Sequence, residues 1–180
     1  IASIGTISLP VHLSSYRERG VLRRFRASGV SEAALLGSQL LVSLGVAFVG
    51  AVTISLLGIV VYGVQMAAAP AEVALAAVVS TFCFAGIGTL LASLAPTARA
   101  AQSAGLMLWF VMLFVSGTSA PLDLLPSWMV SLGKALPLYH SVLAMVDPWI
   151  GRGTNWTQLA IVAGIGLVAT LVSLRVFRWE

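Results

Sequence analysis

The sequence predicts an all-α integral membrane protein, a polytopic bundle of membrane-spanning helices. The chain of 180 residues is 59% hydrophobic and only 9% charged, with a mean hydropathy of +1.01. A soluble domain carries about 25% charged residues, so this chain has too few charges to cover a globular surface. Its apolar residues also form long runs without alternation, which excludes the strands of a membrane barrel and leaves helices as the spanning elements.

The first apolar run, residues 1–13, is shorter than the roughly 20 residues that a span requires. We interpret it as the tail of a span whose beginning lies outside the sequence. Residues 16–29 follow it and are predicted to form an amphipathic helix. This helix holds five Arg residues, half of the basic residues in the chain.

Four longer apolar runs are predicted to be spans. Each can cross a hydrocarbon core of about 30 Å at 1.5 Å per residue, the third only marginally. Small residues are frequent within them and favour a closely packed bundle, but no strict GxxxG motif occurs, so we predict no dimer face from them. The runs are residues 36–62, 73–94, 101–118 and 159–176.

Basic residues are distributed unequally between the two sides of the predicted bundle. When sides alternate from residues 16–29, the five Arg of that segment, Arg99, Arg175 and Arg178 share one side, and Lys134 and Arg152 lie opposite. The positive-inside rule makes the first side cytoplasmic, together with the C-terminus, and predicts a multi-pass protein of the plasma (inner) membrane. Because Arg marks the ends of apolar runs, the net charge of +4 predicts topology and no nucleic-acid partner.

The connection before the last span is unusual for an outer loop. Two apolar pieces of about ten residues each, within residues 124–147, are cut by prolines and are too short to span. We predict a re-entrant helical hairpin on the outer side; an amphipathic loop on the outer surface is the alternative. Tyr and Trp suit the membrane interface. The candidate hairpin residues are Pro121, Pro126, Trp128, Pro137 and Tyr139.

Several kinds of chemistry have no residues to support them. The sequence has no Walker A motif and no charge in the middle of a span, so we predict neither ATP binding nor an ion relay on this chain. His12 and His140 lie on opposite sides, so no metal site is predicted. Asp123 and Asp147 are interpreted as solvated charges that flank the outer segment. The sequon Asn155-Trp156-Thr157 is a pattern common by chance.

One acidic residue, Glu18, conflicts with a purely lipid-bound amphipathic helix. On a helix at 100° per residue, Val21, Leu22 and Phe25 form one apolar stripe, and the Arg residues cover the remaining circumference. Glu18 falls inside that stripe, where burial in lipid would remove its hydration without compensation. A protein partner, or another part of the bundle, that donates a hydrogen bond to Glu18 removes the conflict.

The stretch YRERGVLRRFRASGVSEAALLGSQLL resembles the cytoplasmic coupling segment of ABC-2 type transporter permeases. The matching residues are Arg17-Glu18, Gly20, Leu22, Arg23 or Arg24, Phe25 and Val30-Ser31, with Gly117, Pro121, Leu125-Pro126, Trp128 and Pro137-Leu138-Tyr139 in the outer stretch. The resemblance covers essentially the whole chain, and the order of segments agrees. Against the usual six spans, the first and most of the second are absent, and Gly29 stands where the family often has Pro.

The resemblance implies the membrane half of an ATP-driven exporter. ATP and Mg²⁺ are then expected on a separate or fused ABC ATPase, with no cofactor on this chain, and a second permease half, as a homodimer, is expected as a partner within the lipid bilayer. Leu22 and Phe25 would fill a groove on the ATPase, and Glu18 would form a buried polar contact there. The implied coupling interface is Tyr16, Arg17, Glu18, Arg19, Gly20, Leu22, Arg23, Arg24 and Phe25.

A path without fixed charges suits an amphiphilic or apolar compound, such as a drug, an antibiotic or a lipid-like molecule. Flexible Met and aromatic side chains on the third span could line this path, although plain lipid or bundle packing is favoured for most of them. Two other functions remain open: a non-transporting membrane scaffold and a membrane-embedded enzyme, although no polar cluster at one depth supports the enzyme. The candidate path residues are Met107, Trp109, Phe110, Met112 and Phe114.

Overall fold

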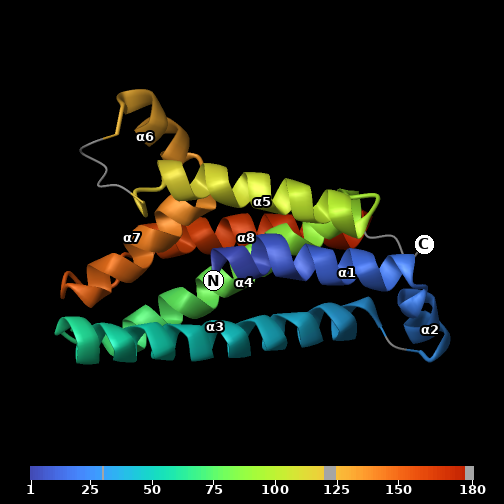
Figure 1. Ribbon diagram of the computed structural model, residues 1–180, viewed down its shortest axis with the longest axis horizontal. Helices are drawn as coiled ribbons and strands as arrows, with labels where there is room; N and C mark the ends of the chain where they lie inside the picture. Colours follow the sequence, from blue (N-terminus) through green and yellow to red (C-terminus); the bar gives the residue numbers. More distant parts are fainter. Residues whose placement is uncertain (30, 120–124, 177–180) are drawn as a thin grey trace.

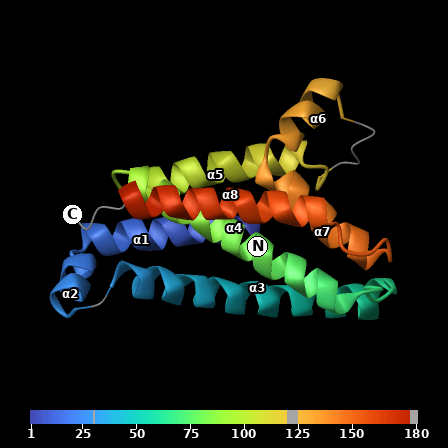
Figure 2. The same ribbon diagram turned by 180° about the vertical axis from the view of Figure 1, so that it is seen from behind.

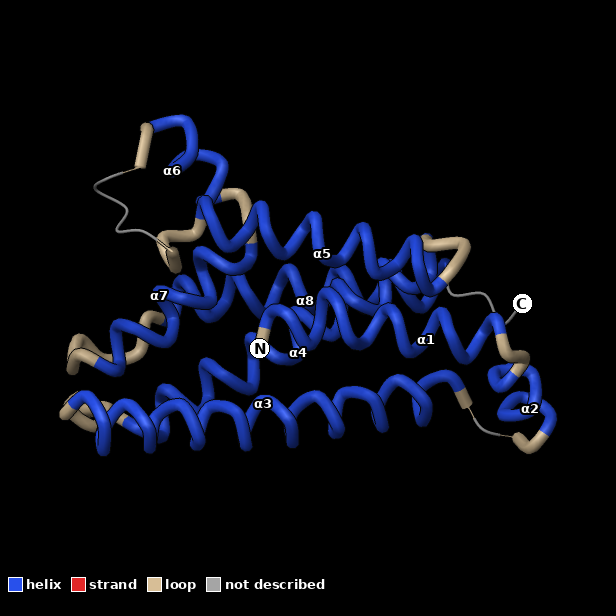
Figure 3. The backbone as a smooth tube through the Cα atoms, in the orientation of Figure 1, coloured by secondary structure: helices blue, strands red, loops and turns tan. Residues whose placement is uncertain are grey.

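The computed structural model describes residues 1–29, 31–119 and 125–176, leaving out the side chains of Arg23, Arg26, Glu32 and Ala33. Every regular element in these ranges is a helix (Figures 1 and 3), and four helices are long and apolar enough to cross a membrane. The predicted all-α fold class is therefore confirmed. The elements are a π-helical turn η1 (Ile4–Ser8) and helices α1 (Leu9–Glu18), α2 (Val21–Ala27), α3 (Glu32–Tyr62), α4 (Pro70–Leu94), α5 (Ala98–Val115), α6 (Ser127–Lys134), α7 (Pro137–Trp149) and α8 (Trp156–Val176).

The long helices run along one axis of the molecule, with connections at its two ends (Figures 1 and 2). We call these the α2 end and the hairpin end, the latter carrying α6 and the tip of α7. Helix α4 is the central element, with η1, α1, α7 and α8 packed on it. A β-carbon on Gly88 of α4 would overlap the carbonyl oxygen of Gly5, so this close approach requires glycine.

The predicted spans agree with the observed helices except near their termini, where capping residues set the limits. Ser31 caps α3 by accepting a hydrogen bond from the Ala34 N–H at 3.2 Å. The helix therefore begins at residue 32, four residues before the predicted span. Thr97 caps α5 in the same way, through Ala100. Gly117, with φ of +78°, follows the end of α5, so this span ends three residues before the predicted limit.

Helix α3 differs from the other spans because little of the chain covers it. Only 6% of its most apolar 18-residue window is buried, against 50% in α4. It lies along one edge of the molecule in both views (Figures 1 and 2). A half-open cavity of about 390 Å³ lies between it and α4 toward the hairpin end, lined mainly by apolar side chains that include Phe48, Met66 and Trp149.

The predicted outer hairpin is formed by two short helices. Helices α6 and α7 meet at an angle of 86°, a geometry shared by a re-entrant loop and a broken span. Pro126 immediately precedes α6 and Pro137 is the first residue of α7, a position that tolerates proline because it needs no intrahelical donor. Trp128 is exposed, and Tyr139 packs edge-on against His140 at a centroid distance of 5.3 Å. Pro121 lies outside the described residues.

Candidate functional site: the α1–α2 elbow

The segment predicted as one amphipathic helix, residues 16–29, is divided by a turn at Gly20. The Arg19 N–H donates to the Ser15 carbonyl, and the Gly20 N–H donates to the Arg17 carbonyl at 3.0 Å. Gly20 has φ of +69°, a left-handed conformation that ends helices because glycine adopts it without steric cost. Residues 16–18 therefore belong to α1, and α2 begins at Val21. We call residues 16–25 the elbow.

Arg17 binds the last turn of α4. Its guanidinium donates to the carbonyl oxygen of Ala92 at 3.1 Å and also to that of Ala95. Carbonyl groups in the final turn of a helix have no intrahelical donor, and the partial negative charge at a helix C-terminus attracts a cation. Arg17 supplies both the missing donors and the favourable charge.

Glu18 binds the first residue of α5. Its Oε1 accepts a hydrogen bond from the Ala98 N–H at 2.8 Å. Ala98 is the first helical residue after the Thr97 cap, so its N–H has no acceptor within the helix. A carboxylate at a helix N-terminus is also favoured by the helix dipole. We call these two side chains, with their contacts to α4 and α5, the Arg17–Glu18 clamp.

The structure thus provides the partner that Glu18 lacked on the predicted amphipathic stripe. The carboxylate is satisfied by another part of the bundle, one of the two possibilities that the sequence left open. The stripe itself does not exist as predicted, since the turn at Gly20 separates Glu18 from the face of α2. A signal was present in Ala95-Pro96-Thr97, where Pro96 and Thr97 mark one helix end and the next helix start. These ends require polar partners.

The apolar residues of the elbow pack inside the chain. Leu22 is only 1% exposed and lies in a cluster of leucines and alanines, against which Tyr16 and Phe25 are partly buried. Leu22 is therefore not available to fill a groove on a partner, contrary to the expectation from the resemblance. Arg19 and Arg24 remain exposed, and the side chain of Arg23 lies outside the described residues. The cluster consists of Leu9, Leu13, Leu22, Leu35, Ala85 and Ala92.

The five candidate path residues of α5 occupy different faces of the helix. Met112 is fully buried in a cluster with Ala2 and Phe84, and Trp109 packs partly against that cluster. These two side chains are part of the bundle core, so Met112 in particular cannot line a path. Met107, Phe110 and Phe114 are 72%, 48% and 54% exposed, and the rings of Phe110 and Phe114 stack with centroids 6.5 Å apart.

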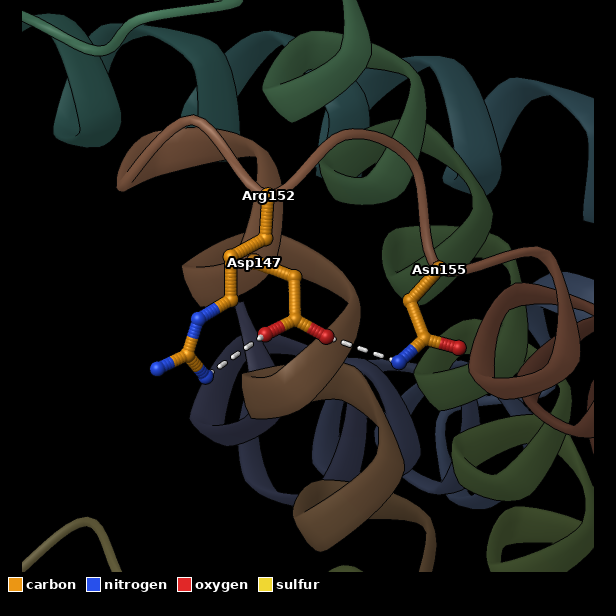
Figure 4. Close-up of polar contacts among 3 residues, drawn as sticks. All are labelled: Asp147, Arg152 and Asn155. Atoms are coloured by element: carbon orange, nitrogen blue, oxygen red, sulfur yellow. Dashed lines mark hydrogen bonds and ion pairs between the residues drawn. The ribbon is translucent and has the colours of Figure 1, made fainter.

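A second polar cluster fastens the hairpin end (Figure 4). Asp147 of α7 accepts a hydrogen bond from Asn155 Nδ2 at 2.7 Å and lies 3.8 Å from Arg152 Nη1. Asp147 is therefore engaged within the chain, and its interpretation as a solvated flanking charge was wrong; Asp123 lies outside the described residues. Asn155 also accepts from the Gln158 N–H at 3.2 Å, which caps α8. The sequon asparagine thus has a structural role.

Two further contacts extend this cluster to α4 and α6. Thr154 donates to Glu72 of α4 at 2.6 Å. The buried ring of His140 lies between Gln158 of α8 and the Lys134 carbonyl oxygen at the end of α6. Sequence reasoning missed Glu72, Thr154 and Gln158, because partners 18 to 82 residues apart leave no local spacing signal. Among the residues that the structure describes, no group of three or more His, Cys, Asp or Glu side chains converges to hold a metal.

A family model described as ABC-2 type transporter matches residues 2–148. The chain belongs to the ABC-2 type transporter family. The match extends from η1 to the tip of α7, so it includes the elbow, the clamp and the hairpin of this ABC-2 chain. Family membership and the apolar helices together make it a multi-pass membrane component of an ABC transporter. No curated protein and no solved structure matches the chain.

Proposed function

We propose that this ABC-2 chain is the permease subunit of an ATP-driven exporter and that the elbow receives the movement of an ABC ATPase. The observation that carries the proposal is the construction of the elbow. Its exposed surface carries Arg19, Arg24 and the Glu18 side chain, and Arg17, Glu18 and Leu22 attach the elbow to the ends and flanks of the spans. A partner that binds the exposed Arg side chains thereby acts on the helices themselves.

The same residues support the orientation and the partners. The Arg-rich α2 end is the cytoplasmic side of the plasma membrane under the positive-inside rule, where ATP is available. ATP and Mg²⁺ are bound by the ATPase subunit and not by this chain. A second copy of the permease completes the transport unit as a homodimer, by analogy with the family.

The transported compound is amphiphilic or apolar, such as a drug or a lipid-like product. The support is the exposed face of α5, where Met107, Phe110 and Phe114 present adaptable apolar surface. Helix α5 carries no charged residue after Arg99, so a compound with a buried formal charge would find no charged partner on this helix near these residues.

Copurification and vesicle transport test the proposal. The full-length protein should copurify with an ABC ATPase, and inverted vesicles should accumulate amphiphilic dyes only when ATP is hydrolysed. Arg24→Glu reverses an exposed charge on the elbow and should reduce ATPase recovery at least tenfold. Lys134→Glu makes the same charge change at the hairpin end, where the Lys134 side chain is exposed, and should leave recovery unchanged.

The outcomes separate the three candidate functions. Copurification without ATP-dependent accumulation would favour a scaffold subunit. Recovery of no ATPase, combined with chemical conversion of a membrane compound, would favour an embedded enzyme. Equal ATPase recovery by the two charge-reversed variants would contradict the role of the elbow.

A further inference from the structure

The Arg17–Glu18 clamp connects the end of α1 to the ends of two helices, α4 and α5, that lie far from it in the sequence. Residues 17 and 18 lie 75 to 80 positions before the groups that they bind. One dipeptide holds the last turn of α4 and the first turn of α5, on both sides of the turn at residues 95–97. Because the two side chains are adjacent, the ends of α4 and α5 cannot separate from α1 without breaking at least one of these contacts.

Helix α2 is joined to the same assembly by packing. Leu22 is buried beside Leu9 and Leu13 of α1 and Ala92 of α4, with Phe25 against the same cluster. Ala92 takes part twice, since its carbonyl oxygen also accepts from Arg17. The apolar cluster therefore fastens α2 to α1, and the clamp fastens the end of α1 to the last turn of α4.

Helix α3 is attached at this end by apolar packing, and among its described residues there no side chain hydrogen-bonds to another helix. It follows α2 directly in the chain, yet a cavity of about 230 Å³ separates its first turns, at Leu36, Gly37 and Leu40, from α4 and α8. Leu35 joins the elbow cluster and Leu36 and Leu40 pack against it, but most of the helix is uncovered. The described part of α3 is thus held at this end by apolar packing, whereas the clamp adds polar contacts between α1 and the ends of α4 and α5.

We propose that Arg17 and Glu18 are positioning residues that join α1, with α2 packed on it, and the α4–α5 turn into one rigid unit, so that displacement of α2 moves α4 and α5 together while α3 shifts relative to them. The inference rests on the proposed function for the source of the displacement. The rigid unit itself is a property of this chain. It is testable without a partner.

Spin-label distances test the rigid unit in the full-length protein in lipid nanodiscs. Cys83 is fully buried on α4, so labels at Ala27→Cys on α2 and Arg99→Cys on α5 can be attached selectively. We expect one narrow distance distribution. Replacing both clamp residues, Arg17→Ala with Glu18→Ala, should at least double its width. Glu18→Gln keeps an oxygen acceptor for the Ala98 N–H and should leave the distribution narrow.

Two controls make the result specific to the clamp. Arg24→Ala removes an exposed charge of α2 and should leave the distribution unchanged. A second label pair, at Val78→Cys and Leu167→Cys, monitors the packing of α4 against α8 away from the clamp. If the double variant broadens the distance distributions of both label pairs, its fold has changed. The 27–99 distribution of Arg17→Lys is then the deciding measurement, because lysine keeps the positive charge but lacks the forked donor of arginine. The inference is overturned if the 27–99 distance distribution stays narrow in the double variant or, where the fold of that variant has changed, in Arg17→Lys.

The complex with the ATPase separates failure of the inference from failure of the proposed function. Nucleotide should change the distance from residue 27 to a label at Leu41→Cys on α3, where Leu41 is 70% exposed, and leave the 27–99 distance fixed. A nucleotide-dependent change in the 27–99 distance overturns the rigid unit. No change in either distance, with a narrow 27–99 distribution in the isolated chain, contradicts the proposed function instead.

Discussion

Helices α3 and α4 are both long, apolar and adjacent in the chain, yet they occupy very different environments. Helix α4 lies at the centre of the bundle, whereas α3 forms one edge (Figure 1). The difference lies in how their small residues are used. A β-carbon on Gly88 of α4 would overlap a neighbouring backbone, whereas a β-carbon on Gly45 or Gly50 of α3 would have no heavy atom within 4 Å.

This comparison shows what hydropathy does and does not encode. In a bilayer, lipid tails are as apolar as leucine, so hydrophobicity selects the spans without ordering them within the bundle. Close backbone approach and polar contacts at helix ends place α4 at the centre and tie it to α5. Helix α3 makes few such contacts, and the cavities on its α4 side are the consequence.

The largest effect is expected at the closest approach of α4. Gly88→Val would force apart α4 and η1, since even the β-carbon overlaps the Gly5 carbonyl oxygen. Overpacking of this kind typically costs about 3 kcal/mol, and here the obstacle is backbone that cannot change rotamer. The free energy of unfolding, measured in bicelles by steric trapping, should fall by that amount. A fall below about 0.5 kcal/mol would show that the two helices are not in close contact.

The clamp should have the next largest effect. Arg17→Ala leaves two carbonyl oxygens at the end of α4 without their donor, and the expected loss of unfolding free energy is about 1.5 kcal/mol. Arg24→Ala is the matched control, because Arg24 is exposed on the neighbouring α2, and it should change stability by less than about 0.5 kcal/mol. Equal losses of unfolding free energy in the two variants would mean that removal of any positive charge is destabilising, and that the hydrogen bonds of Arg17 to the end of α4 have no particular effect.

At the hairpin end, Asn155→Ala should destabilise the start of α8. The substitution removes both the cap to the Gln158 N–H and the hydrogen bond to Asp147, at an expected cost of about 1 kcal/mol. Thr157→Ala destroys the sequon without touching either contact and should have almost no effect on thermal stability. If Thr157→Ala proved as damaging as Asn155→Ala, the structural role of Asn155 would be wrong.

The smallest effect is expected on α3. Gly50→Ala adds a methyl group where no heavy atom lies within 4 Å, so no contact is disturbed, and the lower backbone entropy of alanine favours the helix. Unfolding free energy should stay within about 1 kcal/mol of the unsubstituted protein and should not decrease. A large loss would place α3 against a partner that covers Gly50 and would remove the contrast with α4.

The sequence predicted the helical spans because their length and apolarity are local properties. It did not predict the break in the elbow. A helical wheel assumes one continuous helix, so it treated Gly20 as an ordinary helical residue, although this glycine ends α1. Nor did it reveal the partners of Glu18 and Asp147, which depend on how distant helix ends meet. The choice between a path and bundle packing for Met112 was left open for the same reason: composition identifies an adaptable side chain but not the face that it occupies.

Hydrogen exchange at the Ala98 amide tests the central claim most directly. The first N–H of a helix has no intrahelical acceptor and normally exchanges freely, so protection of Ala98 reports the contact with Glu18. In the full-length protein in nanodiscs, Glu18→Ala should accelerate exchange at Ala98 at least tenfold, and Glu18→Gln should change it less than threefold. Unprotected Ala98 in the unsubstituted protein, or equal exchange in Glu18→Ala, would contradict the clamp.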